Sequence, residues 1–277
     1  MANRTIALIL MAAGIVLTAF PVFAEDPAKT VEAEGQVILG DDSTIGQAKA
    51  AALNNARRNA LEKATGVTVH GSSTVYNFQL INDLVITATK GVITAEKVIE
   101  NTCKEKNAQL FCTAKIEAQV KPLNLERRGD FAVTRALVRR FGSEASKQGT
   151  VFQSKDEIQI QASSNQDAYL NVFSVDQVGN VARLYPNDFC GFELLPAGKD
   201  LAIPDAHQRE SGLKFRVLTP KGSKRSVESV LIIAMKNKNI LLAQGAENPT
   251  ITDLMQELSG MDPSLWVDKA VGYEVRE

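Results

Sequence analysis

The stretch from Ala168 to Asn187, which reads AYLNVFSVDQVGNVARLYPN, constrains the fold of this chain more than any other. Its first part, Tyr169–Val175, is rich in β-branched and aromatic residues, and a second such run follows a turn that contains Gly179. Two β-forming runs joined by a short glycine-containing loop are typical of a β-hairpin. We therefore predict a hairpin at the centre of an all-β domain, and no residue in it indicates a reaction.

Residues 1–24 predict an export signal. Arg4 supplies the positive start, Ile6–Phe20 is apolar, and small residues precede a cut after Ala24. The apolar run has about 15 residues, fewer than the roughly 20 that a membrane span needs, and a retained membrane anchor is the alternative. The expected location is the periplasm, with no transmembrane span after the signal is cleaved.

The net charge limits the kinds of partner that we expect, and the length indicates the number of domains. The formal net charge is −1, and removing the signal would take away one arginine. This balance gives no electrostatic footprint for nucleic acid or for an anionic membrane. Residues 25–277 exceed the roughly 100–200 residues typical of one domain, so two domains are expected.

Residues 29–121 predict a small α/β domain. A first strand alternates from Val31 to Leu39, and alanines then recur at helical spacing until Gly66 ends the helix. Residues 75–89 fit either a helix or a strand, and the roughly 3.6-residue period of their apolar positions favours a second helix. A β-hairpin over residues 91–121 completes the domain.

The cysteines of this hairpin predict a disulfide. If the turn is centred between Asn107 and Ala108, Cys103 faces Cys112 across the strands. Directly opposed residues of an antiparallel pair have Cα atoms about 4.5–5.5 Å apart, which suits a disulfide, and an exported protein would keep it oxidised. Two buried thiols are the alternative. Cys190 is left over, either sheltered beneath a loop or paired between two chains.

The remainder predicts a β-sandwich. Residues 122–155 are expected to be a connection that includes a first strand near Phe131, and residues 156–277 contain several short strands with frequent turn signals. Short helices are expected after Pro249. The predicted fold class is therefore α+β, a small α/β domain followed by a β-sandwich with short C-terminal helices.

A search for catalytic chemistry finds little. The chain has no G-x-S-x-G, H-E-x-x-H or P-loop motif. His70 ends a predicted strand. His207 lies near Asp205 and Glu210, which together could bind a metal or move a proton, but their spacing matches no regular ligand pattern. We expect no enzymatic activity, no cofactor and no metal site.

One loop remains as a candidate surface. Beyond the hairpin, aromatic residues gather in the segment from Asp188 to Lys199 and just before it. A ligand or a partner protein could bind there, and the residues expected to contact it are Tyr185, Asn187, Phe189 and Phe192.

The stretch DAYLNVFSVDQVGNVARLYPN, followed by AGKDLAIP and ESVLIIAMK, resembles the bacterial family called domain of unknown function 4384. The likeness covers about residues 129–240. It implies an extracytoplasmic β-sandwich that serves as an accessory module, and it brings no catalytic residues.

The stretch VEAEGQVILGDDSTIGQAKAAALNNARRNALEKATGVTV, with the hairpin that begins at Gly91, resembles the N-terminal domain of the flagellar assembly protein T group and related envelope lipoprotein domains. This likeness covers roughly residues 29–121. The chain lacks the lipid-attachment cysteine of some of those relatives.

These observations lead to an expectation and two alternatives. The expected function is that of a non-enzymatic periplasmic accessory or scaffold protein, which docks with other envelope proteins in an assembly such as the flagellum. Self-association is also open. The first alternative is a periplasmic module that binds a glycan or another small ligand. The second is a hydrolase that uses His207.

Overall fold

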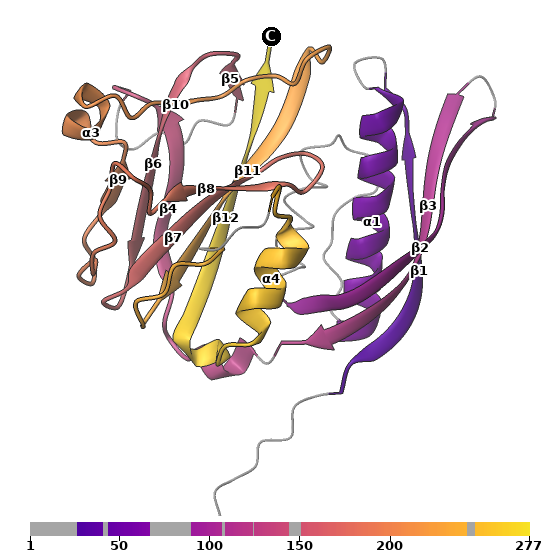
Figure 1. Ribbon diagram of the computed structural model, residues 1–277, viewed down its shortest axis with the longest axis horizontal. Helices are drawn as coiled ribbons and strands as arrows, with labels where there is room; N and C mark the ends of the chain where they lie inside the picture. The colour runs from indigo at the N-terminus through magenta and orange to yellow at the C-terminus, as the bar shows by residue number, and fades with distance from the viewer. Residues whose placement is uncertain are drawn as a thin grey trace, which may run out of the picture.

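The structure is a computed structural model that describes residues 27–40, 44–66, 90–106, 109–123, 125–143, 151–242 and 247–277. The described residues form an N-terminal lobe of one helix on a three-stranded sheet and a C-terminal β-sandwich (Figure 1). The predicted α+β class is confirmed. The export signal, His70 and the helix expected within residues 75–89 lie outside the described residues.

The N-terminal lobe contains β1 (Lys29–Ile38), α1 (Ile45–Thr65), β2 (Gly91–Lys106) and β3 (Gln109–Pro122). The strands form an antiparallel sheet in the order β1-β3-β2, and α1 covers one face. Thr44 and Gln47 form a capping box at the start of α1, and Gly66 ends the helix with a φ of 72°.

The alanine face of α1 brings the helix unusually close to β1. Ala52, Ala56 and Ala60 are completely buried against the sheet. Directly beneath them β1 carries Gly35, where a Cβ atom would overlap backbone atoms of α1. Small side chains on both elements therefore set the spacing between helix and strand.

Side chains of α1 also cover the free edge of β1. Asn55 Nδ2, Asn59 Nδ2 and Lys63 Nζ donate hydrogen bonds, at 3.1, 2.7 and 3.0 Å, to the backbone carbonyls of Gln36, Glu34 and Glu32. The opposite edge, β2, has two register irregularities and exposes Lys97. Occupied carbonyls, bulges and lysines are the means by which proteins keep sheet edges from pairing with other chains.

The sandwich consists of two sheets. The first contains β4 (Val133–Arg140), β6 (Glu157–Ser164), β9 (Leu201–Ile203) and β10 (Phe215–Arg216), with β6 paired to the other three. The second has the order β5-β12-β11-β7-β8, with bounds Val151–Gln153, Trp266–Arg276, Arg225–Met235, Tyr169–Val175 and Val181–Tyr185. β4 and β5 lie within residues 122–155, so much of that segment belongs to the sandwich.

The hairpin predicted over residues 168–187 consists of β7 and β8. Asp176 shapes its turn, because its Oδ1 accepts hydrogen bonds from the backbone N–H groups of Val178 and Asn180, both at 2.9 Å. Gly179 follows with a φ of 89°. The helical segments of this half are η1 (Leu125–Arg128), α3 (Ala206–Glu210), α4 (Ile251–Ser259) and η2 (Pro263–Leu265).

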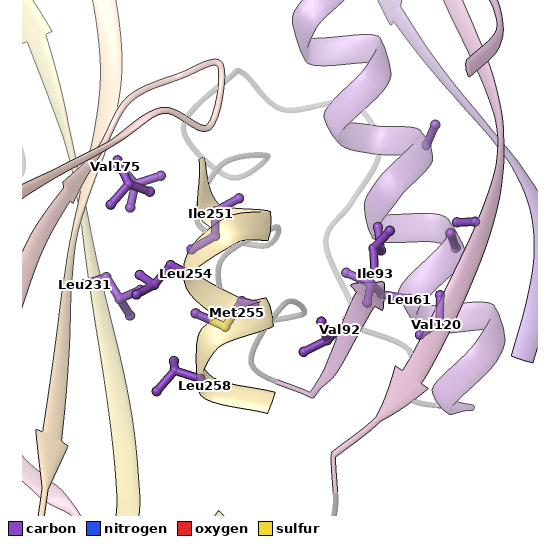
Figure 2. Packing of buried hydrophobic residues seen from close by; sticks show 14 of the residues in the cluster. Leu61, Val92, Ile93, Val120, Val175, Leu231, Ile251, Leu254, Met255 and Leu258 are labelled. Carbon is purple, nitrogen blue, oxygen red and sulfur yellow. The ribbon is translucent and has the colours of Figure 1, made fainter. Parts of the chain in front are cut away.

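Two hydrophobic cores meet on the five-stranded sheet. One lies between the two sheets of the sandwich. The other begins under α1 in the N-terminal lobe and continues, without a break, to the outer face of the five-stranded sheet. Helix α4 lies in the middle of this second core, and its apolar face points Leu254 and Leu258 towards the five-stranded sheet, whereas Met255 lies towards Val92 (Figure 2). We call the contacts of α4 with β2 and the five-stranded sheet the lobe junction.

A buried amide fixes the chain that leads towards α4. Asn171 of β7 is fully buried, its Oδ1 accepts a hydrogen bond from the Leu241 N–H at 3.0 Å, and its Nδ2 donates to the Asn239 carbonyl at 3.0 Å. The bonds place Leu241 inside the core. A satisfied buried amide specifies one path for the loop, because any other path would leave its polar atoms unpaired.

Candidate functional site

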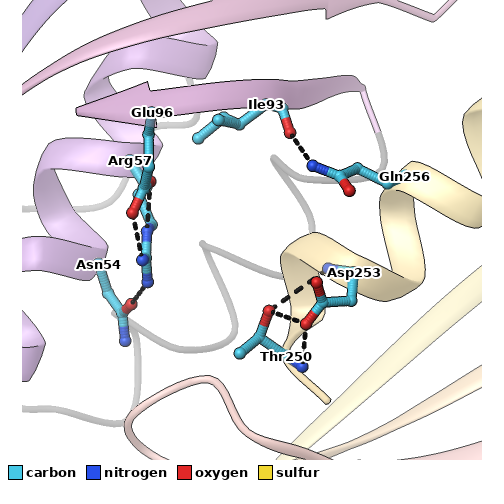
Figure 3. Close-up of polar contacts among 7 residues, drawn as sticks. All are labelled: Asn54, Arg57, Ile93, Glu96, Thr250, Asp253 and Gln256. Atoms are coloured by element: carbon cyan, nitrogen blue, oxygen red, sulfur yellow. Dashed lines mark hydrogen bonds and ion pairs between the residues drawn. The ribbon is translucent and has the colours of Figure 1, made fainter. Parts of the chain in front are cut away.

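Polar contacts supplement the apolar core at the lobe junction. Arg57 of α1 donates from Nε and Nη2 to the two carboxylate oxygens of Glu96 of β2, at 2.8 and 2.6 Å (Figure 3). Its Nη1 donates to Asn54 Oδ1 at 3.2 Å. Asn54 in turn donates to the backbone carbonyl of Gln177, in the β7–β8 turn, at 3.4 Å. This series of contacts runs from the N-terminal sheet to the sandwich.

Further hydrogen bonds join the lobes. Gln256 of α4 donates to the Ile93 carbonyl of β2 at 3.1 Å (Figure 3). At the start of α1, Gln47 Nε2 donates to Ser223 Oγ at 2.5 Å. Thr250 and Asp253 form the capping box that begins α4. The lobes are therefore held at the start and the middle of α1 as well as through α4.

The predicted disulfide is confirmed. Cys103 and Cys112 are bonded, lie directly opposite one another in the β2–β3 register, and have Cα atoms 4.0 Å apart. The bond ties the two strands near the hairpin tip. Cys190 is the remaining free cysteine, and it is buried. Burial raises the pKa of its thiol, which keeps it in the less reactive protonated form.

The four residues of the candidate loop surface do not form one open site. Tyr185 is buried and donates a hydrogen bond to the Gly191 carbonyl at 2.8 Å. Asn187 is engaged locally, because it donates to the Leu184 carbonyl and accepts from the Phe189 N–H.

The two phenylalanines of this loop differ in exposure. The ring of Phe192 packs against those of Tyr169 and Tyr185, with centroids 5.3 and 6.4 Å away. Phe189, by contrast, is 58% exposed. The exposed aromatic surface expected here thus reduces to Phe189.

The residues around His207 serve local structure. His207 is exposed on the short helix α3, and Asp205 caps that helix by accepting from the Gln208 N–H. Arg209 binds Glu157 at 2.7 Å. Within the part of the chain that the structure describes, no three His, Cys, Asp or Glu side chains lie close enough to hold a metal ion. In the same residues, no helix is both long and apolar enough to span a membrane.

A partly buried acid went unnoticed in the sequence. Glu228 lies within β11, directly opposite Tyr273 of β12, whose hydroxyl donates to Glu228 Oε2 at 2.7 Å. Burial raises the pKa of Glu228, the nearby charge of Asp176 raises it further, and the Tyr273 hydrogen bond opposes the shift. Burial and Glu228 also raise the pKa of Tyr273. The signal that was available is an acidic residue in the largely apolar strand VESVLIIAM.

Comparison with known families supports the resemblance of the C-terminal half. Residues 151–237 match the family described as Domain of unknown function (DUF4384). The likeness to the flagellar assembly protein T group gains no such support, and no curated protein matches the chain. The matched segment stops before β12, although β12 pairs with β11 along its whole length, so the sandwich extends beyond the matched residues on both sides.

Proposed function

We propose that the protein is a non-enzymatic accessory protein of the cell envelope, located in the periplasm, which holds other envelope proteins together. The single observation that supports this most is the continuous core that joins the two lobes through α4. A shared apolar core of this kind resists relative motion of the lobes, since separating them would expose Leu254, Met255 and Ile93 to water. Surfaces on the two lobes are then presented at a fixed spacing, as a scaffold requires.

The disulfide supports the location. Cys103–Cys112 closes a hairpin near its tip, and such bonds persist in oxidising compartments. The apolar segment at residues 6–20 also supports export, as part of an N-terminal signal. Association with a flagellum rests only on the likeness of residues 29–121, so it is the narrower part of the proposal.

Photo-crosslinking in intact cells tests the function. A photoreactive amino acid would replace Ile99 on β2 in one strain and Phe189 on the sandwich in another, because both side chains are exposed. We expect each position to capture an envelope protein and the two positions to capture different proteins. Placing the same probe at buried Val230 is the matched control, which should capture nothing. Failure of both exposed positions to capture any envelope protein would refute the proposal.

The ligand-binding alternative retains one supporting observation, the exposure of Phe189 beside the partly buried Phe192. Aromatic rings of this kind pack against sugar faces. Titration with soluble peptidoglycan fragments, followed by nuclear magnetic resonance, should then shift the resonances of Phe189 and of the residues next to it. In the Phe189→Ala variant, the neighbouring residues should no longer respond. The exposed residue Leu194, changed to alanine, serves as the control. Unchanged Phe189 resonances at saturating fragment would rule this alternative out.

A further inference from the structure

The near-neutral charge of the whole chain conceals a basic end on the sandwich. Four lysines lie there on two segments that are far apart in sequence, and all four are exposed: Lys155, Lys214, Lys221 and Lys224. We call these residues the basic end.

Backbone contacts bring the segments together. The Lys155 N–H donates to the Val217 carbonyl at 2.7 Å, and the Glu277 N–H donates to the Lys224 carbonyl at 2.9 Å. The β5–β6 turn, the segment 214–224 and the end of β12 thus lie side by side. In Figure 1 they form the upper end of the sandwich, next to the C-terminus.

The arginines of this region are already occupied. Arg140 binds Asp156 at 2.7 Å, Arg209 and Arg216 share Glu157, and Arg276 binds Glu274 at 2.6 Å. The side-chain ammonium groups of the four lysines form no hydrogen bond or ion pair among the contacts of the described residues, although the charge of Lys214 contributes to lowering the pKa of Glu157. Asp205, Glu210 and Glu277 are the remaining exposed acids nearby. The lysine ammonium groups therefore leave a net positive potential at this end.

Apolar side chains are also exposed on or next to these segments. Leu218 is 55% exposed and Val151 is 38% exposed. Ile45, at the start of α1, is 52% exposed and lies near the same end, because Gln47 contacts Ser223. Leucine, valine and isoleucine side chains among flexible lysines suit the interface of a bilayer, where apolar groups enter the headgroup region and ammonium groups contact phosphates.

We propose that the basic end is a docking surface for a membrane that contains anionic phospholipids. This inference is independent of the proposed docking of envelope proteins, because it concerns a different surface and a different partner. An acidic polypeptide is the competing partner for the lysines, and the experiment below includes it as an outcome. A lipid surface accounts for both the lysines and the exposed apolar side chains.

Vesicle flotation with the purified exported protein tests the proposal. Vesicles of phosphatidylcholine with about one third phosphatidylglycerol should bind the protein, and pure phosphatidylcholine should bind it far less. Since each lysine at an anionic surface contributes about fivefold in binding, changing Lys155, Lys221 and Lys224 to glutamate should weaken binding roughly a hundredfold or more. Added salt should weaken binding by the wild type and have little effect on this variant.

Two matched variants make the test specific. The triple change Lys97→Glu, Lys238→Glu and Lys269→Glu alters the net charge equally but elsewhere, and it should leave binding nearly unchanged. Leu218→Ser should weaken binding without altering the salt dependence. All variants share one N-terminus, so any retained apolar segment contributes equally, and circular dichroism confirms that each is folded.

Three outcomes would overturn the proposal. The first is equal binding to neutral and anionic vesicles. The second is an equal loss of binding in the control triple variant. The third is binding of polyglutamate, but not of vesicles, with the same dependence on Lys155, Lys221 and Lys224, which would assign the surface to an acidic polypeptide.

Discussion

Gly35 of β1 lies directly beneath Ala52 of α1, so close that a methyl group at position 35 would overlap the Ala52 carbonyl oxygen. The obstructing atoms belong to the backbone of a 21-residue helix, which cannot move as a side chain would. The small side chains on the alanine face of α1 and the absence of a Cβ atom at Gly35 together allow the helix to lie this close to β1.

Gly35→Ala should therefore destabilise the protein by at least about 3 kcal/mol, because overpacking against backbone forces the helix away from the sheet. Denaturant unfolding measures this change. Gly40→Ala is the control, since a Cβ at that position meets no atom within 4 Å, and its effect should be small. If Gly35→Ala unfolded at the same denaturant concentration as the wild type, the close contact between α1 and β1 would be contradicted.

Leu254→Ala should uncouple the two lobes. Leu254 is fully buried at the lobe junction, and such a truncation costs about 2–5 kcal/mol. Fluorescence of the buried Trp266 reports on the sandwich side, whereas helical circular dichroism reports mainly on α1. We expect the two signals to change together in the wild type and at different denaturant concentrations in the variant. Leu194→Ala, on the surface, should keep them together.

Replacing both Cys103 and Cys112 with serine should lower the free energy of unfolding by about 2–3 kcal/mol, the loop-closure value for a short loop. Reduction of the wild type should produce a similar loss, and the double variant should not respond to reductant. Native protein should also resist alkylation at Cys190 until it unfolds, since that thiol is buried. Rapid labelling in the native state would contradict the burial.

Glu228→Gln should stabilise the protein at neutral pH. The pKa of Glu228 in the fold is raised above its ordinary value of 4.5, so the native state favours the protonated acid. The stability that the protonated acid contributes is complete below about pH 4.5 and is lost as the pH rises through the raised pKa. Glutamine retains the acceptor for Tyr273 and never ionises.

The advantage of Glu228→Gln over the wild type should thus grow from acidic to neutral pH. Thermal unfolding at several pH values measures it. The exposed residue Glu117, changed to glutamine, provides the control. A difference that is constant with pH, or that grows on acidification, would contradict a raised pKa.

Local patterns proved predictable from the sequence. The disulfide followed from the symmetry of one hairpin, where Cys103 and Cys112 are equally distant from the turn. The β7–β8 hairpin followed from strand propensity around a glycine turn. Neither required knowledge of distant residues.

Features that depend on distant residues did not follow from the sequence. The pattern of ITDLMQELSG predicts a short helix, but nothing in it indicates that Met255 would lie near Val92 of the other lobe. Tyr185 looked available within its loop, yet the fold buries it beside Phe192. The basic end was missed because a total charge cannot reveal how Lys155 and Lys224 gather in space.

The cover that Asn55, Asn59 and Lys63 place over β1 bears on how this protein behaves when it is crowded. Three carbonyls that would otherwise accept a foreign strand are already occupied. The lobe can therefore accumulate in a confined compartment without recruiting neighbours into a growing sheet. Shortening the two asparagines would leave the Gln36 and Glu34 carbonyls open to pairing with another strand, and it is the alanine face of α1 that brings these side chains close enough to cover the edge.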